Sequence, residues 1–193
     1  MLEMSKRSGK SRLARRAFLA TSGAGLAGLA FWLATPHPGE AAGPAMVSIV
    51  MFSNAGVRER VLSLPKVVKS DAGWRKQLGY DSFEVTRHGD TERPFTGALL
   101  NEHQKGIFCC ICCDTAVFSS DTKFESGTGW PSFWAPIAKE NIVETTDTGF
   151  GMIRTAISCR LCDAHLGHVF NDGPKPTGLR YCMNSVALKF AKA

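Results

Sequence analysis

Two cysteine pairs of the same spacing constrain the fold of this 193-residue chain more than any other feature. Cys110 and Cys113 form one C-x-x-C pair, and Cys159 and Cys162 form the other, each at the end of a predicted strand. Two such pairs make a tetrahedral zinc site with four thiolate ligands when the fold brings them together. Because 45 residues lie between Cys113 and Cys159, we expect the pairs on different hairpins of one domain, joined by one zinc ion.

The cysteine pattern leaves two alternatives open. The run from Cys109 to Cys113 holds four cysteines, so Cys109 and Cys112 also have C-x-x-C spacing. The pairs could instead form disulfides, which an oxidising compartment permits, although seven cysteines leave at least one outside any such pairing. We favour zinc, because the N-terminal leader resembles a signal for the export of folded proteins, with which a metal loaded beforehand could travel.

Residues 1–42 have the composition of a bacterial export signal. A basic region over 1–16 precedes an apolar, glycine-rich region over 17–34, and small residues follow. The run RRAFL at 15–19 resembles a twin-arginine signal, and GEA at 39–41 is a candidate cleavage site. A retained membrane anchor is the alternative, but the apolar region falls short of the ~20 residues that a span prefers. We therefore expect twin-arginine export to the periplasm or the cell exterior.

The net charge of +6 gives no case for nucleic-acid binding. Residues 1–41 hold six Lys or Arg against two Glu, a net of +4, which leaves +2 for the remainder. The basic balance therefore comes mostly from the leader, without the basic patch that nucleic acid requires.

The rest of the chain divides into an N-terminal extension or linker over 43–65 and a main domain over 66–193. An apolar run over 46–52 predicts an edge strand, with a turn at 54–56. Ser70 predicts an N-cap for a helix over 71–78, with Trp74 and Leu78 on one face and Gly79 as its terminator. The run DSFE at 81–84 resembles a capping box that opens a second short helix, which Gly89 ends.

The main domain then changes to strands and turns. Segments of strand length are separated by clusters of Gly, Pro, Asp and Asn. Short strands at close spacing favour antiparallel sheets over a parallel α/β fold, so we expect a mainly β domain. The expected strands cover residues 106–109, 116–119, 141–145, 151–159, 166–170 and 185–190.

Cys182 stands apart from the other cysteines and has the surroundings of an activated thiol. Arg180 precedes it by two residues, so both side chains leave the same face of an extended segment, and the amide of Asn184 follows it by two. A nearby cation lowers the pKa of a thiol and favours the nucleophilic thiolate. His165 and His168 lie upstream of Cys182. Instead of serving the thiol, these two histidines could stabilise a turn or bind a metal together with Cys182. Cys182 itself could be a buried structural cysteine.

Several motifs in this order resemble the methionine sulfoxide reductase B family. Any one alone is weak, but the set, which spans roughly residues 70–190, is specific. The motifs are TERPFTG at 91–97, KFESG at 123–127, GWPSF at 129–133, HLGHVF at 165–170, DGP at 172–174 and RYCMNS at 180–185.

The resemblance implies two antiparallel sheets stapled by zinc, in a tent-like arrangement with short helices at the front, and reduction of the R epimer of methionine sulfoxide in peptides and proteins. Cys182 matches the catalytic cysteine, and Trp130 matches the aromatic residue that holds the substrate's methyl group. The match also selects Cys110 and Cys113 over Cys109 and Cys112 as zinc ligands, together with the second pair. The implied companions of the catalytic cysteine are His165, His168, Arg180 and Asn184.

The chain departs from the family pattern at Thr128. Many members have a resolving cysteine there, between the two glycines that precede the tryptophan. A sulfenic acid formed on Cys182 must then be cleared by an external reductant, thioredoxin-like or another thiol, or by Cys109 or Cys112. We expect direct attack by the external thiol, oxidised proteins and peptides as substrates, and a monomeric enzyme.

Two other function classes compete with this interpretation. A non-catalytic, exported zinc-binding β module would need the cysteine pairs but would have no use for a separate thiol flanked by Arg180 and Asn184. A disulfide reductase would use a C-x-x-C pair free of zinc, so zinc at one ion per chain would count against it.

Overall fold

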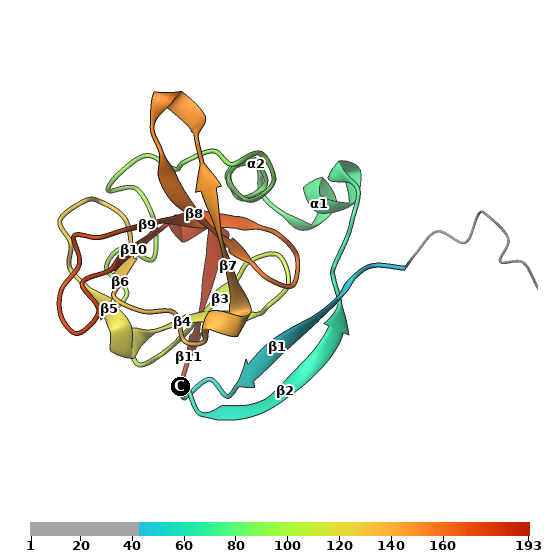
Figure 1. Ribbon diagram of the computed structural model, residues 1–193, viewed down its shortest axis with the longest axis horizontal. Helices are drawn as coiled ribbons and strands as arrows, with labels where there is room; N and C mark the ends of the chain where they lie inside the picture. Colours follow the sequence, from blue (N-terminus) through green and yellow to red (C-terminus); the bar gives the residue numbers. More distant parts are fainter. Residues whose placement is uncertain (1–42) are drawn as a thin grey trace, which may run out of the picture. The chain divides into compact units, whose positions relative to one another are not determined.

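The computed structural model describes residues 43–193, which are built around a six-stranded antiparallel sheet (Figure 1). Its strand order is β5-β6-β10-β9-β8-β7. A three-stranded sheet has the order β11-β3-β4, and a hairpin of β1 and β2 forms a third sheet. The strands are β1 (Met46–Phe52), β2 (Arg58–Pro65), β3 (Gly106–Cys110), β4 (Ala116–Ser119), β5 (Lys123–Phe124), β6 (Ser132–Phe133), β7 (Ile142–Asp147), β8 (Arg154–Cys159), β9 (His165–Phe170), β10 (Arg180–Met183) and β11 (Leu188–Lys192).

This architecture confirms the mainly β class with two antiparallel sheets in the main domain, to which the hairpin adds a third. The leader, twin-arginine signal and cleavage site predicted within residues 1–42 lie outside the described residues. Between residues 43 and 193, no helix has the length and apolar character needed to cross a membrane.

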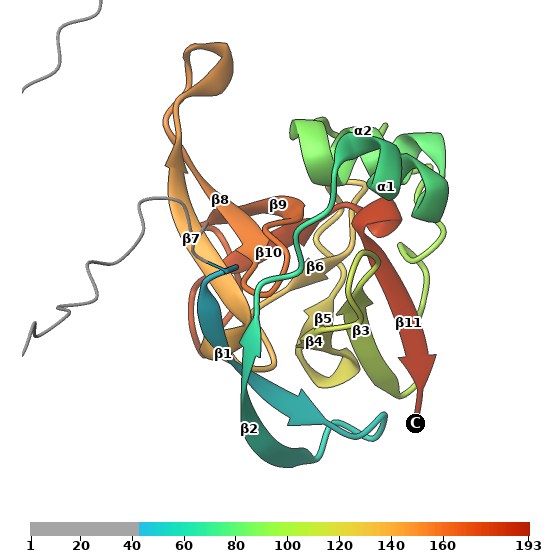
Figure 2. The ribbon, with the colours of Figure 1, turned by 90° about the vertical axis from the view of Figure 1, so that its right-hand side faces the viewer.

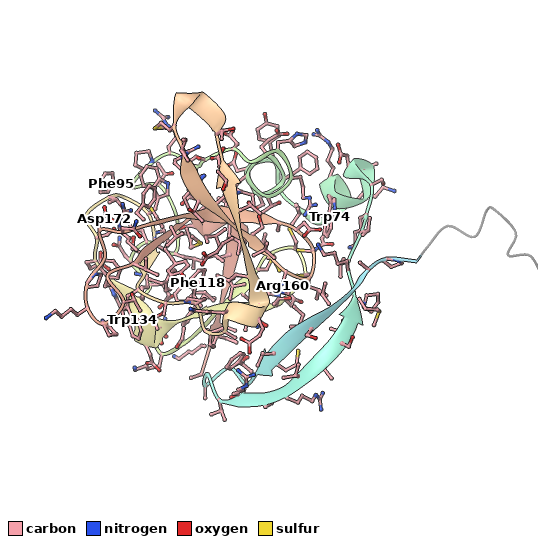
Figure 3. The ribbon with its side chains drawn as sticks, in the orientation of Figure 1. Trp74, Phe95, Phe118, Trp134, Arg160 and Asp172 are labelled. Atoms are coloured by element: carbon pink, nitrogen blue, oxygen red, sulfur yellow. The ribbon has the colours of Figure 1, made fainter. Side chains whose placement is uncertain are left out.

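One hydrophobic core joins the six-stranded and three-stranded sheets. Phe133 of β6 stacks on Phe118 of β4 with ring centroids 4.5 Å apart, and meets Phe108 of β3 edge-on at 4.9 Å. All three rings are fully buried, and Phe118 lies in the middle of the domain in Figure 3. The burial of large side chains from facing sheets supplies the main driving force for this packing.

The two short helices differ from the sequence prediction at their caps. Ser70 begins α1 (Asp71–Gln77) as predicted, because its Oγ accepts a hydrogen bond from the Gly73 N–H at 3.2 Å. The prediction that Gly79 terminates this helix is wrong: Leu78 is the C-cap, and Gly79, in an extended conformation, is the N-cap of α2 (Tyr80–His88). The predicted capping box is also wrong, since residues 81–84 already lie inside α2, whereas Gly89 ends α2 in the left-handed region with φ 73°.

Three strands, β7, β8 and β11, begin later than predicted because 3₁₀ turns occupy their expected first residues. The four turns are η1 (Ser120–Thr122), η2 (Lys139–Asn141), η3 (Gly149–Gly151) and η4 (Ser185–Ala187). The η3 turn forms the tip of the β7–β8 hairpin, which projects beyond the rest of the sheet (Figure 2). In η4, the N–H groups of Ser185 and Val186 donate to the buried Glu92 carboxylate at 2.7 and 3.0 Å, which withdraws them from any strand ladder.

Asn141 attaches the β1–β2 hairpin to the main domain. Its Oδ1 accepts from the Val50 N–H, and its Nδ2 donates to the carbonyls of Val50 and Ala116, each at 2.8 Å. Ile49 and Val50 of β1 are almost fully buried. The apolar run and the turn predicted for residues 46–56 are therefore confirmed, and β2, which was not predicted, completes the hairpin.

Candidate active site and metal centre

Strand β10 holds Cys182 in the interior of the six-stranded sheet. Cys182 pairs with Ser132 of β6 on one side and with His168 of β9 on the other. Because β10 is extended, Arg180 and Cys182 point to the same face, as the sequence predicts. Two neighbouring strands thus fix the position of the thiol.

A β-bulge in β9 brings the two histidines together. Residues three apart on a regular strand point to opposite faces. Here His165 pairs with Ser158 and Gly167 with Ile157, so β9 holds one extra residue and His165 and His168 share a face. Their ring centroids lie 5.2 Å apart with the rings edge to face.

His168 is held by an acidic partner that the sequence analysis missed. Its Nε2 lies 2.8 Å from Asp147 Oδ2, and Arg154 Nη2 donates to the same oxygen at 2.6 Å. The Gly149 N–H, His168 and Arg154 lower the pKa of Asp147 to about 2, so it is a carboxylate at neutral pH. Asp147 and Arg154 form the last cross-strand pair of the β7–β8 hairpin. In the sequence, the only indication of this pair is the opposite charge of the two residues on either side of the predicted turn.

His165 has a different environment from His168. Burial, and then the neighbouring His168, lower the pKa of His165 to about 4, so it is neutral at pH 7. Its buried Nε2 has no hydrogen-bond partner within residues 43–193. His165 lines a 480 Å³ cleft beside the β7–β8 hairpin, whereas His168 lines both this cleft and the pocket of Cys182.

The pocket over Cys182 has a volume of about 120 Å³. Four residues that the sequence singled out line it together, while His165 and Arg180 stand outside the lining. Trp130 is fixed as one wall, because its Nε1 donates to the Glu92 carbonyl at 3.1 Å. The lining residues are Thr91, Trp130, Arg154, Gly167, His168, Phe170, Cys182 and Asn184.

Arg180 acts on Cys182 from a fixed position. Its Nε and Nη2 donate to the two carboxylate oxygens of Asp172 at 2.9 and 2.8 Å, and its guanidinium lies 4.4 Å from the Phe170 ring centre. The sequence predicts a lowered thiol pKa, but burial raises the pKa of Cys182 overall, while the Thr128 hydroxyl, Arg180 and Ser132 oppose that rise. Arg180 lowers the pKa of Cys182, as expected, but the desolvation of the buried thiol raises this pKa by more.

Asn184 connects the site to the loop that holds Trp130. Its Nδ2 donates to the Leu166 carbonyl at 3.2 Å, and its Oδ1 accepts from the Glu92 N–H at 3.0 Å. The buried carboxylate of Glu92 accepts a hydrogen bond from the Ser185 N–H of η4, a structural role that the sequence did not predict. Its position in the motif at 91–97 was the only signal for this role.

The two spare cysteines lie away from the pocket. Cys109 is buried with Ile107 and Ala116 in a separate small cluster, and burial raises the pKa of its thiol to about 11. Cys112 is buried in the main core. Neither is among the described residues that line the pocket over Cys182.

The two cysteine pairs meet in one cluster that could hold a metal ion. All four sulfurs lie within 4.8 Å of one another, with Cys110 and Cys162 at 3.7 Å and Cys113 and Cys159 at 3.5 Å. Zinc–sulfur bonds of about 2.3 Å in a tetrahedron place sulfurs about 3.8 Å apart, whereas a disulfide requires about 2.05 Å. All seven cysteines, which lie in the described part of the chain, are free thiols. The donor set and its spacing fit zinc.

The two pairs also share one backbone geometry. Asp114 and Asp163 each follow the second cysteine of a pair and have positive φ values of 65° and 56°. Each donates its N–H to the carbonyl of the first cysteine, Cys110 or Cys159, at 3.0 and 2.9 Å. Two equivalent turns thus present their sulfurs to a common centre.

Comparisons with known proteins agree with this geometry. The model of the SelR domain matches residues 78–192. A peptide methionine sulfoxide reductase MsrB of Herminiimonas arsenicoxydans is 54% identical over 125 residues, which cover 65% of this chain and 91% of the relative. The MsrB of Hahella chejuensis is 53% identical over 67% of this chain and 94% of the relative, and that of Synechococcus sp. (strain RCC307) is 53% identical over 64% and 91%. The chain therefore belongs to the SelR domain family, that of the B-type methionine sulfoxide reductases.

Proposed function

We propose that this protein reduces the R epimer of methionine sulfoxide in peptides and proteins to methionine, with Cys182 as the nucleophile. The observation that carries the proposal is the pocket that places the Cys182 thiol beside Trp130, His168 and Asn184. Family membership supports the same chemistry and disfavours a non-catalytic binding module. Trp130 offers a flat apolar wall against which a methyl–sulfur group can pack.

The first half of the reaction requires one thiolate and one proton. The thiolate of Cys182 attacks the sulfoxide sulfur, and the sulfoxide oxygen takes up the proton. The oxygen then moves to the Cys182 sulfur as its bond to the methionine sulfur and the new sulfur–sulfur bond both break, so methionine leaves and Cys182 becomes a sulfenic acid. His168 is the proposed proton donor, because it lines the pocket and Asp147 fixes the orientation of its ring. His165, which is neutral at pH 7, packs edge to face against the His168 ring.

The second half regenerates the thiol. Two thiols of an external reductant convert the sulfenic acid back to the thiol, with release of water and formation of a disulfide in the reductant. The location of Cys109 and Cys112 away from the pocket supports direct attack by that reductant. We propose a thioredoxin-like protein, or another thiol, as the donor.

One structural zinc ion per chain, held by the four clustered cysteines, completes the proposal. The metal would cross-link the hairpins that carry the two pairs and would take no part in the reaction. We also propose that residues 1–42 direct export by the twin-arginine route, and that the enzyme acts as a monomer outside the cytoplasm.

A trapping experiment tests the nucleophile. The protein receives one equivalent of a methionine-R-sulfoxide peptide without reductant, and dimedone then labels any sulfenic acid. We expect one label per chain, on the Cys182 peptide in mass spectrometry. Label on another cysteine, or unlabelled protein after methionine has formed, would refute Cys182 as the oxygen acceptor.

A further inference from the structure

A short chain of hydroxyl groups ends at the Cys182 thiol. Thr128 Oγ1 lies 3.8 Å from Cys182 Sγ and 2.8 Å from Ser126 Oγ. Ser126 Oγ is in turn 2.7 Å from Ser132 Oγ, and the Ser132 hydroxyl donates to the Trp130 carbonyl at 3.2 Å. Ser132 is fully buried, so water does not compete for its contacts.

The number of available protons limits the direction of this chain. A hydroxyl has one proton to donate. When the Ser132 hydroxyl donates to the Trp130 carbonyl, the contact between Ser126 and Ser132 uses the Ser126 proton. Ser126 then has nothing to donate to Thr128. The Thr128 proton therefore points either to Ser126 Oγ or to Cys182 Sγ.

The two positions of this proton match the two charge states of the nucleophile. A thiol can donate its S–H to Thr128 Oγ1, which leaves the Thr128 proton for Ser126. A thiolate can only accept, so the Thr128 proton turns to the sulfur. Ser126 Oγ then keeps the backbone N–H of Thr128 as a donor at 3.4 Å.

We propose that Thr128 is a catalytic residue, whose hydroxyl switches its proton from Ser126 to Cys182 and so stabilises the attacking thiolate. The proposal rests on the function proposed above and assigns a role to the residue that stands in place of a resolving cysteine. A buried thiolate needs such donors, because burial raises the pKa of Cys182 and the Thr128 hydroxyl is the largest influence that opposes the rise.

Two substitutions separate the hydroxyl from the shape of the loop. Thr128 lies between Gly127 and Gly129, which have φ values of 73° and 93°, so a purely structural role in this tight turn must be distinguished. Thr128→Val keeps the branched shape and removes the proton, whereas Thr128→Ser keeps the proton and removes the methyl group. Ser126→Ala removes the competing acceptor together with the contacts of Ser126 to Ser132 and to the Thr128 N–H. Thr145→Val makes the same atomic change as Thr128→Val on the exposed surface of β7.

The first readout is the rate at which iodoacetamide alkylates Cys182 in the zinc-loaded full chain, followed from pH 6 to pH 10 by mass spectrometry. A hydrogen bond to a charged group corresponds to about a tenfold change in the thiolate population. We expect Thr128→Val to alkylate about tenfold more slowly at pH 7, with its pH profile shifted upward. Thr128→Ser, Ser126→Ala and Thr145→Val should stay within about twofold of wild type or react faster.

The second readout is the single-turnover rate of methionine formation, which should fall by a similar factor in Thr128→Val alone. Equal alkylation profiles for Thr128→Val and wild type would overturn the proposal, as would equal slowing in Thr128→Ser and Thr128→Val. Alkylation does not depend on substrate, so a wild-type protein that fails to form methionine refutes the proposed function and leaves the role of Thr128 decided by the first readout.

Discussion

At the scale of single residues, the site is a balance between burial and hydrogen bonding. Burial raises the pKa of Cys182, and the neighbouring hydroxyls and Arg180 oppose it. The same burial keeps His165 neutral, while Asp147 remains charged and holds His168. Each of these effects yields a prediction.

Removal of the Asp147 carboxylate should slow the reaction without unfolding the protein. Asp147→Asn keeps the size of the side chain but weakens the contacts to His168 and Arg154. Because proton donation by a positioned group contributes about a hundredfold or more, loss of its orientation should lower kcat by roughly tenfold. Steady-state kinetics check this, with Glu59→Gln on the exposed strand β2 as the matched control. An unchanged kcat in Asp147→Asn would remove His168 as the donor.

His165 should make the protein less stable in mild acid. Its pKa is about 4 in the folded state against an ordinary value of 6.5, so the unfolded state binds its proton first as the pH falls. The free energy of unfolding should therefore decrease from pH 6.5 towards pH 4, a range above the titration of Asp147. Urea unfolding should show a smaller loss over this range in His165→Gln. Parallel curves for the two proteins would mean that His165 is not buried as a neutral ring.

A thiol placed at position 128 should restore an internal resolving step. Thr128 Oγ1 lies 3.8 Å from Cys182 Sγ, and in Thr128→Cys the new sulfur can attack the sulfenic acid. One equivalent of sulfoxide without reductant should then consume two thiols per chain, against one in wild type, as counted with a thiol reagent. Loss of two thiols in wild type would instead implicate Cys109 or Cys112.

At the scale of elements, sequence predicts continuous strands better than it predicts their ends. The strands β3, β4, β8 and β9 follow from runs of strand length between turn residues, whereas their pairing comes from the structure. The two-residue strands β5 and β6 lie in a loop rich in glycine and proline and carry no periodicity to detect. The start of β11 was displaced by Glu92, 93 residues away from Ser185, a contact that no local pattern reveals.

The β9 bulge shows why the composition of the site was easier to predict than its geometry. The motif at 165–170 names both histidines, but an unbroken strand would place them on opposite faces. Only the shift in pairing with β8 brings His165 and His168 together. Asp147 comes from the end of β7, in the neighbouring β7–β8 hairpin, and belongs to no motif of its own.

Asn141 should contribute strongly to the attachment of the β1–β2 hairpin. Asn141→Ala leaves three backbone groups without their partner, at residues 50 and 116. Because these three buried backbone groups lose their hydrogen-bond partner, the free energy of unfolding should fall by about 3 kcal/mol. Urea unfolding measures the loss, with the exposed Asn101→Ala as the control, and hydrogen exchange should show faster exchange in β1. Equal stability of both variants would contradict this role.

At the scale of the whole molecule, two distant hairpins meet at the cysteine cluster. The sequence predicts its members, because two C-x-x-C pairs have few other uses, but the choice of Cys110 over Cys109 needed the family resemblance. The structure adds the reason: Cys109 points into a separate cluster with Ile107 and Ala116.

Metal should be required for the stability of the domain. The purified protein should contain one zinc ion per chain by elemental analysis, and Cys159→Ser should lose it and unfold at lower urea concentration. Cys109→Ser, a matched change outside the cluster, should retain the metal. Protein without zinc whose four clustered thiols are blocked to thiol reagents would establish disulfides instead.

One assay tests the central claim most directly. The purified protein receives dithiothreitol and dabsylated methionine sulfoxide as separate R and S epimers, beside Cys182→Ser. We predict turnover of the R epimer only, abolished in Cys182→Ser while zinc content and folding are unchanged. No turnover of either epimer by folded, zinc-loaded protein, or full activity in Cys182→Ser, would contradict the account.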